Sequence, residues 1–230
     1  MKKVLSVLFV FVMISAVFGV TASAKSTAIR NINDSMVFAR ESDPFDIRRA
    51  TLYNNGRKCG NVYVIGITGT NPTFDRQVLN NIYSCVLSGI GMNSPLLKEV
   101  IKAANEKIPA GADVIIIGHS LGGMIGQQFA GNREMKEKYN ILNIVGMGSP
   151  YISQIGMEGE LHRMADSGDV IPYLSLAFAG NFFGGNFTYE NGGFFGNPDG
   201  AHNVSYKEAE VWQKYDCLGI ENGGNVLYLW

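Results

Sequence analysis

The chain has 230 residues, and its 19 basic and 20 acidic side chains give a formal net charge of −1, so no positive excess favours a nucleic acid as partner. The length fits one domain with a sizeable core. Three cysteines are too few for a fold built on disulfides, and neither a Cys-x-x-Cys pair nor clustered histidines argue for a metal.

The first 24 residues have the pattern of a secretory signal peptide. Two lysines precede an apolar run at residues 4–20, and Ala22-Ser-Ala24 has the small-residue spacing of a cleavage site. We expect cleavage after Ala24, a secreted or extracytoplasmic protein, and a single domain formed by residues 25–230. The alternative is an uncleaved membrane anchor, because the apolar run approaches the length that spans a bilayer.

The three cysteines leave the disulfide pattern open. An odd number means that at least one thiol is unpaired or bonds outside the chain. A secreted protein can pair two of the three, and the sequence does not choose which: Cys59, Cys85 and Cys217.

Two strands are predicted in the first third of the chain. Residues 25–47 are polar and mixed, which indicates an N-terminal arm or a short helix. Strands are expected at 48–53 and 61–68, joined at Asn54-Asn55-Gly56, because an Asn-Gly pair favours a hairpin turn. The second strand ends at a polar, glycine-containing exit around Thr70.

Two helices are expected next. Residues 74–87 have apolar side chains at helical spacing, which favours a helix packed on the core over the alternative of a movable flap. Ser94 and Pro95 suit the N-cap and the first position of a second helix that extends to about Lys107.

The segment 113–126 reads as a strand, a sharp turn and a helix, with Gly118-His-Ser-Leu-Gly122 at the turn. Glycines are expected on both sides of Ser120 because a Cβ there would meet the neighbouring strand or helix. Such a turn lifts the Ser120 hydroxyl above the sheet edge. It also directs the first helical amides, including that of Leu121, at the space beside it, where they suit an oxyanion. The alternative is a glycine-rich turn without chemistry.

The remaining strands and helices alternate and predict an α/β fold with a parallel sheet. The helix after Ser120 is expected to continue to about Tyr139, followed by strands at 141–145 and 161–165. Ligands of such sheets lie beyond the carboxyl ends of the strands, where Thr70 and Ser120 both fall. Thr70 is therefore a candidate second oxyanion donor, by its amide and hydroxyl.

A serine nucleophile needs a base and a carboxylate to orient that base. Asp166 and Asp169 both lie at a strand end, and Asp169 is favoured because Val-Ile-Pro behind it would shield it from water. Among the three histidines, His202 is the candidate base: we expect it in a loop before a helix at 205–215. His119 should point away from the nucleophile side, and His162 falls within a strand.

Residues 173–200 alternate phenylalanine with glycine and asparagine. We favour a β-hairpin packed on the core. The alternative is an apolar rim that meets acyl chains or a lipid surface.

The elbow and the chain order Ser120, Asp169, His202 together resemble the class 3 (fungal-type) lipase family of the α/β-hydrolase superfamily. The resemblance covers roughly residues 60–215. Thr68 stands where the family usually has arginine, and the stretch between Thr70 and the elbow is short for a full helical lid. The motifs that carry the resemblance are Gly118–Gly123, Ile67–Thr70, Gly146–Pro150, Asp169–Leu174 and, more loosely, His202 with Ser205, Tyr206 and Trp212.

The resemblance implies an α/β-hydrolase fold, with a central, mostly parallel sheet flanked by helices. It also implies hydrolysis of carboxylic esters of lipids or related acyl compounds, without a cofactor. Ser120 would be the nucleophile, Asp169 the acid and His202 the base, and Thr70 with the Leu121 amide would form the oxyanion hole. Peripheral contact with a lipid surface is a further expectation. The alternatives are acyl transfer on the same triad and a non-catalytic secreted lipid- or surface-binding protein of the same fold.

Overall fold

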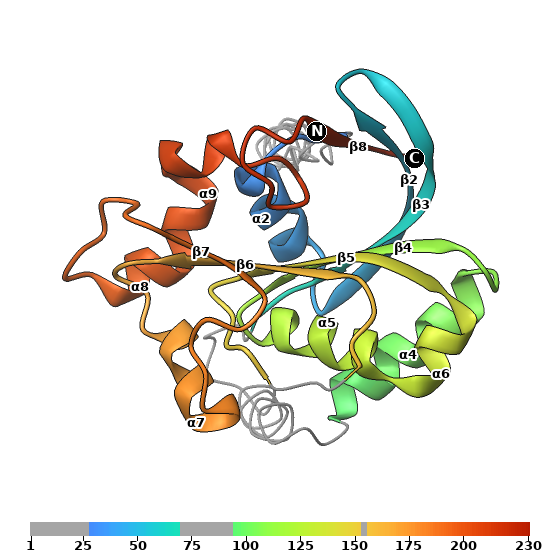
Figure 1. Ribbon diagram of the computed structural model, residues 1–230, viewed down its shortest axis with the longest axis horizontal. Coiled ribbons are helices and arrows are strands. Elements are labelled where there is room, and N and C mark those ends of the chain that lie inside the picture. Colours follow the sequence, from blue (N-terminus) through green and yellow to red (C-terminus); the bar gives the residue numbers. More distant parts are fainter. Residues whose placement is uncertain (1–27, 70–93, 153–155) are drawn as a thin grey trace, which may run out of the picture.

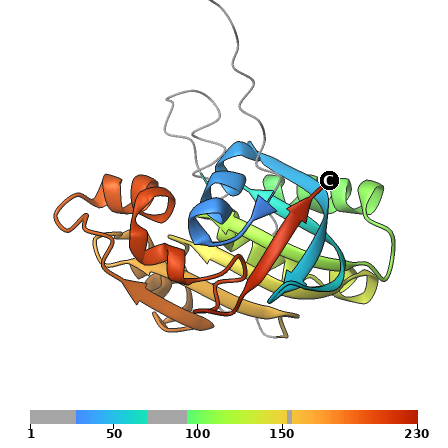
Figure 2. The same ribbon diagram turned by 90° about the horizontal axis from the view of Figure 1, so that it is seen from above.

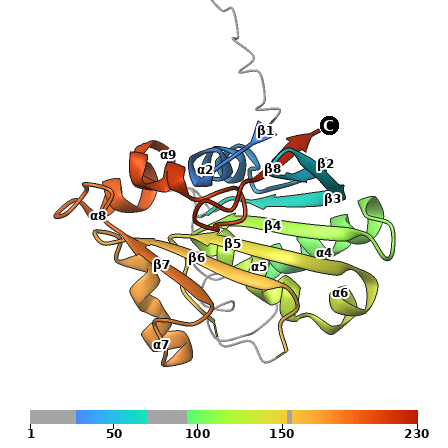
Figure 3. The same ribbon diagram turned by 45° about the horizontal axis from the view of Figure 1, so that its top comes forward.

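A mixed β-sheet of eight strands runs through the part of the chain that this computed structural model describes, residues 28–69, 94–152 and 156–230. The order across the sheet is β1-β8-β2-β3-β4-β5-β6-β7, and most of it can be followed in Figure 3. The strands are β1 (Ala28–Ile29), β2 (Phe45–Asn54), β3 (Arg57–Ile67), β4 (Asp113–His119), β5 (Asn140–Met147), β6 (Glu160–Asp166), β7 (Asn186–Glu190) and β8 (Asn225–Leu229).

The five strands from β3 to β7 pair in parallel, and β2, β8 and β1 extend the sheet in antiparallel fashion. Apolar side chains of the central strand β4 alternate between two core clusters, with Ile115 and Ile117 on one face and Val114 and Ile116 on the other. A strand buried on both faces needs such a continuous apolar run. The predicted α/β class with a mostly parallel sheet is confirmed.

Helices cover both faces of the sheet (Figure 1). One face carries α2 (Ile32–Glu41), whose N-cap Asn31 accepts a bond from the Asp34 amide, and α9 (Tyr206–Glu208) lies beside it. Figure 2 shows α2 and the C-terminal helical segments on the same side. The other face carries α4 (Pro95–Lys107), α5 (Leu121–Gly131) and α6 (Arg133–Lys138). None of the helices within the described ranges is long and apolar enough to cross a bilayer.

Local sequence patterns are confirmed where the controlling residues are neighbours in the chain. Asn55 and Gly56 form the predicted turn with positive φ of 47° and 76°, and the hairpin strands on either side extend further than expected. The α4 helix begins at Pro95 with Ser94 as its cap, and ends at Lys107. The predicted helix at 74–87 and the signal sequence lie outside the described residues.

The continuous helix predicted from the elbow to Tyr139 is wrong. Asn132 has extended backbone angles of −71° and 127°, and its side chain accepts the Met135 amide. Asn132 therefore ends α5 and caps α6, because an asparagine side chain that bonds the amide three residues ahead starts a new helix.

The predicted hairpin within 173–200 is also wrong. The segment begins with a 3-10 turn at Ile171–Leu174 and α7 (Ser175–Ala179), and then β7 pairs in parallel with β6. The helix expected at 205–215 is replaced by short pieces, because Ala209 has extended backbone angles of −72° and 132°. The pieces within this range are α9 and a 3-10 turn at Glu210–Lys214, and α8 (Pro198–Gly200) and a π-helical turn at Ala201–Ser205 precede them.

Two of the cysteines lie within the described residues, and both are free thiols. Cys59 is exposed, whereas Cys217 is buried. The two are therefore not bonded to each other, and Cys85 lies outside the described residues.

Candidate active site

Ser120 occupies the turn between β4 and α5 in a strained conformation, with φ of 54° and ψ of −120°. A positive φ is costly for any residue with a Cβ and persists only where the surroundings enforce it. The Ser120 amide donates to the Met147 carbonyl at 2.8 Å, which ties the turn to the end of β5. Although Ser120 stands at the N-cap position, its side chain makes no capping bond, so the hydroxyl is not used to hold the helix.

The glycines beside Ser120 are enforced by close backbone approaches. A Cβ on Gly118 would overlap the backbone of Gly122 at the start of α5, and a Cβ on Gly122 would overlap the Ile67 carbonyl at the end of β3. The sequence-based explanation of these two glycines, crowding by the neighbouring helix and strand, is confirmed.

One of the two predicted oxyanion donors is described. Leu121 is the first residue of α5, so its amide belongs to the N–H groups that a helix leaves without an intrahelical partner. Thr70 lies outside the described residues. The preceding Gly69 passes so close to the serine that a Cβ on it would lie 2.8 Å from Ser120 Cβ. The loop that leads to Thr70 therefore starts beside Ser120.

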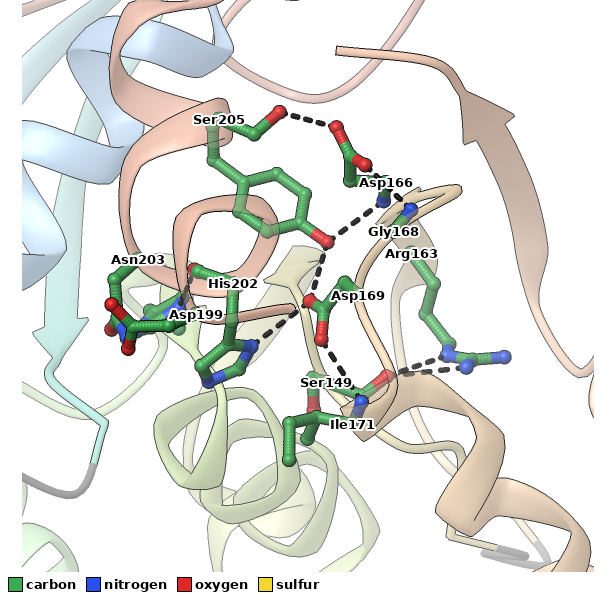
Figure 4. Close-up of polar contacts among 12 residues, drawn as sticks. Ser149, Arg163, Asp166, Gly168, Asp169, Ile171, Asp199, His202, Asn203 and Ser205 are labelled. Atoms are coloured by element: carbon green, nitrogen blue, oxygen red, sulfur yellow. Dashed lines mark hydrogen bonds and ion pairs between the residues drawn. The ribbon is translucent and has the colours of Figure 1, made fainter. Parts of the chain in front are cut away.

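Asp169 and His202 form a direct contact (Figure 4): Nδ1 of His202 lies 2.9 Å from Oδ2 of Asp169. Asp169 is only 1% exposed, and its Oδ1 accepts the amide of Ile171 at 2.9 Å. A buried carboxylate that faces Nδ1 requires the proton to be on that nitrogen, because a carboxylate can only accept. Nε2 of His202 is then the free acceptor of the ring.

Asp166, the alternative candidate acid, makes structural hydrogen bonds, none of which goes to His202. Its Oδ2 accepts the Ser205 hydroxyl at 2.5 Å and the Gly192 amide at 2.9 Å, and its Oδ1 accepts the Gly168 amide at 2.8 Å. These bonds tie the end of β6 to the loop after β7 and to the π-helical turn. Asp166 therefore fixes the loop that presents Asp169.

The reason given for preferring Asp169 is corrected by the structure. Val170 is 55% exposed and does not shield the carboxylate, although Pro172 is buried. The shielding contacts come instead from Gly148 and Tyr206. A Cβ on Gly148 would lie 2.7 Å from Asp169 Oδ2 and 3.0 Å from His202 Nδ1, so only a glycine leaves room for the pair.

Tyr206 is a site residue that the sequence did not single out beyond the family motif. Its hydroxyl donates to Asp169 Oδ2 at 2.8 Å and accepts the Asp166 amide at 2.9 Å. Burial, followed by the nearby charge of Asp169, raises the pKa of Tyr206 well above its usual value, so the hydroxyl stays protonated. Its four-residue spacing from His202 is the signal that could have pointed to it, since residues four apart in a helix share a face.

His119, next to the serine, contacts His202, the candidate base. Its Nε2 lies 2.9 Å from the His202 carbonyl oxygen, and the two rings are 4.5 Å apart at 38°. Burial is the largest cause of a pKa well below the ordinary value, and the charge of His202 adds to it. His162, by contrast, lies in β6 and contacts Glu160.

The three predicted triad residues lie at the carboxyl end of the parallel strands. Met147 bonds the Ser120 amide, and the adjacent Gly148 packs against both Asp169 and His202. Within the described residues, Ser120 Oγ makes no hydrogen bond to His202, and such contacts are often long in enzymes without substrate. The arrangement combines a strained serine with an oriented imidazole, which is suited to proton transfer from a hydroxyl.

Two other features do not enter this site. The described ranges contain no group of three or more His, Cys, Asp or Glu side chains arranged to hold a metal. A groove of about 440 Å³ lies near the β2–β3 hairpin, at the opposite end of the strands, and is lined by Thr51, Tyr53, Gly56, Val226 and Tyr228.

No family model, no curated protein and no solved structure matches this chain.

Proposed function

We propose that this chain is a secreted serine hydrolase that cleaves carboxylic esters of lipids or related acyl compounds. The observation that carries the proposal is the buried contact between Asp169 and His202. Gly148 packs on this pair, and the neighbouring Met147 carbonyl accepts the amide of Ser120, a serine with a positive φ. Buried carboxylates are normally paired, and this one is paired with an imidazole whose second nitrogen is left to act as a base.

The proposed reaction steps follow from the position of the His202 proton on Nδ1, which leaves Nε2 as the proton acceptor. Nε2 of His202 takes the Ser120 proton while Oγ attacks the ester carbonyl, and Asp169 stabilises the imidazolium that forms. The amides of Leu121 and Thr70 hold the oxyanion. The imidazolium then protonates the departing alcohol, leaving an acyl-enzyme, and a water activated by the same nitrogen releases the acid. Oxyanion donors and a placed base each contribute about 10²-fold or more.

The substrate class is supported by the surface that follows Asp169. Large apolar side chains are exposed along this stretch, and exposed apolar patches mark interaction sites, including those for lipid surfaces and apolar ligands. The resemblance of the elbow and acid motifs to class 3 lipases supports the same class. The exposed side chains are Val170, Tyr173, Leu174, Leu176, Phe183, Tyr189 and Phe195.

The proposal is tested by labelling the folded protein with a fluorophosphonate and by hydrolysis of a nitrophenyl-ester series. Wild type should be labelled on Ser120 and should hydrolyse the esters, whereas Ser120→Ala should do neither. Ser167→Ala is the matched control, since it removes another hydroxyl of the same region and should leave both readouts unchanged. A folded wild-type protein that is neither labelled nor active would refute hydrolysis and favour a lipid-binding role. Ester products formed with an added alcohol would identify acyl transfer.

A further inference from the structure

We propose that His119 is a positioning residue that holds His202 through its backbone and its ring. The inference rests on the proposed function. It concerns a residue that touches neither the ester nor the reacting oxygen in the mechanism above.

The first support is the bond to the backbone of the base. His119 Nε2 lies 2.9 Å from the His202 carbonyl oxygen, and a carbonyl can only accept, so His119 carries its proton on Nε2. His202 sits in a π-helical turn, Ala201–Ser205, and such turns loosen the regular ladder of helical bonds. The His119 N–H, at the end of β4, therefore holds the His202 carbonyl in a turn that constrains its backbone less than a regular α-helix would.

The second support is the ring contact. The imidazoles of His119 and His202 are 4.5 Å apart and tilted by 38°, and the ring of Tyr206 lies 6.2 Å from that of His119. His119 is 3% exposed, so its ring is packed on nearly all sides. One face of the base therefore rests on a fixed surface, while its Nδ1 is held by Asp169.

The surroundings of His119 favour its neutral form. Burial is the largest cause of its lowered pKa, and the nearby charges of His202 and Arg40 add to it; Arg40 is itself placed by a 3.1 Å bond to Asn203 Oδ1. Two imidazolium ions would repel each other strongly at this separation. A neutral His119 leaves His202 free to take up and release the proton during turnover.

The test separates the donor from the ring in the full chain. His119→Phe keeps an aromatic ring and removes the donor, whereas His119→Gln keeps an N–H donor and removes the ring. We measure kcat and KM on a soluble nitrophenyl ester, the thermal midpoint, and the NMR signal and hydrogen exchange of the His202 Nδ1 proton. Loss of the partners that orient metal-bound histidines typically lowers affinity or activity by about 10- to 100-fold, and we expect a loss of the same order for His202.

For His119→Phe we expect kcat to fall by about 10-fold or more with KM unchanged, and the Nδ1 proton to exchange faster. His119→Gln should recover part of kcat. If His119→Phe does not fold, His119→Leu, compared with His119→Gln, tests the same donor.

A lower thermal midpoint with kcat and the Nδ1 signal unchanged would overturn the proposal, because His119 would then be merely structural. If wild type does not hydrolyse any ester but the Nδ1 exchange still responds to His119→Phe, hydrolysis fails while the positioning of His202 stands.

Discussion

The hydroxyl of Tyr206 lies 2.8 Å from Oδ2 of Asp169, the same oxygen that faces His202 Nδ1. Both side chains are buried, and the Tyr206 oxygen also accepts the Asp166 amide. One phenol therefore joins the loop after β6 to the helical segment that carries His202.

Tyr206→Phe should lower stability and change its dependence on alkaline pH. At neutral pH the loss of the hydroxyl leaves the Asp166 amide and Asp169 Oδ2 each without one hydrogen bond, which should lower the free energy of unfolding by about 1–3 kcal/mol. The raised pKa of Tyr206 means that above pH 10 the unfolded state releases a proton that the folded state keeps, so wild-type stability falls as pH rises. In Tyr206→Phe, the fall of the unfolding free energy with pH should be smaller by up to about 1.4 kcal/mol per pH unit.

Urea unfolding at several pH values above 9 measures this slope. Tyr228→Phe removes an exposed hydroxyl and serves as the control. Equal slopes for wild type and Tyr206→Phe would contradict the assignment.

Gly148→Ala should lower kcat by about 10²-fold, because the new methyl would displace the Asp169–His202 pair and a misplacement of about 1 Å can cost that much. Gly148 also has a φ of 57°, so the substitution adds strain. Gly146→Ala, where the nearest atom would be an ordinary 3.4 Å away, is the control. Equal kcat values for the two folded variants would show that the pair tolerates displacement.

The two buried aspartates should respond differently to loss of charge. Asp169→Asn should lower kcat by about 10⁴-fold, because an amide favours the wrong tautomer of His202. Asp166→Asn should act mainly on stability, by about 1–3 kcal/mol, because it weakens the bonds to Ser205 and Gly192. Steady-state kinetics and urea unfolding of both variants separate the effects. A larger loss of kcat in Asp166→Asn would reverse the assignment of the acid.

Arg163→Lys should destabilise the protein by about 3 kcal/mol. The Arg163 guanidinium is 1% exposed and bonds the carbonyls of Ser149, Phe182 and Gly184 together with the Ser175 hydroxyl. Burial lowers its pKa to about 10, yet it remains charged near neutral pH. An ammonium cannot reach all of these acceptors, so several become unsatisfied.

The control for this substitution is Arg133→Lys, at an exposed i,i+4 pair with Glu137. Its effect should stay within about 0.5 kcal/mol. A similar small effect at Arg163 in chemical unfolding would show that the guanidinium bonds contribute little to stability.

His119→Gln should make the protein less sensitive to acid. The lowered pKa of buried His119 means that below pH 6.5 the unfolded state binds a proton that the folded state does not, so wild-type stability falls as pH falls towards the folded-state pKa. Glutamine does not titrate, which should reduce this slope by up to about 1.4 kcal/mol per pH unit. The free energy of unfolding is measured between pH 7 and 5 for both proteins. If it falls with the same slope in wild type and His119→Gln, a neutral His119 is contradicted.

The sequence by itself determined the features that depend on neighbouring residues. The cap and first turn of α4, the Asn55-Gly56 turn and Gly118, whose Cβ would meet the backbone of Gly122, follow from bonds or steric contacts between residues close in the chain. The alternation of apolar strands and helices likewise predicted the α/β class.

Only the tertiary structure decided how distant segments meet. Asp166 and Asp169 are three residues apart and chemically equal, and the choice between them depends on which one faces His202, 33 residues beyond Asp169. The parallel pairing of β7 and the contact of His119 with His202 depend in the same way on packing between elements that are distant in the chain. The free energy of such packing cannot be read from a local sequence pattern.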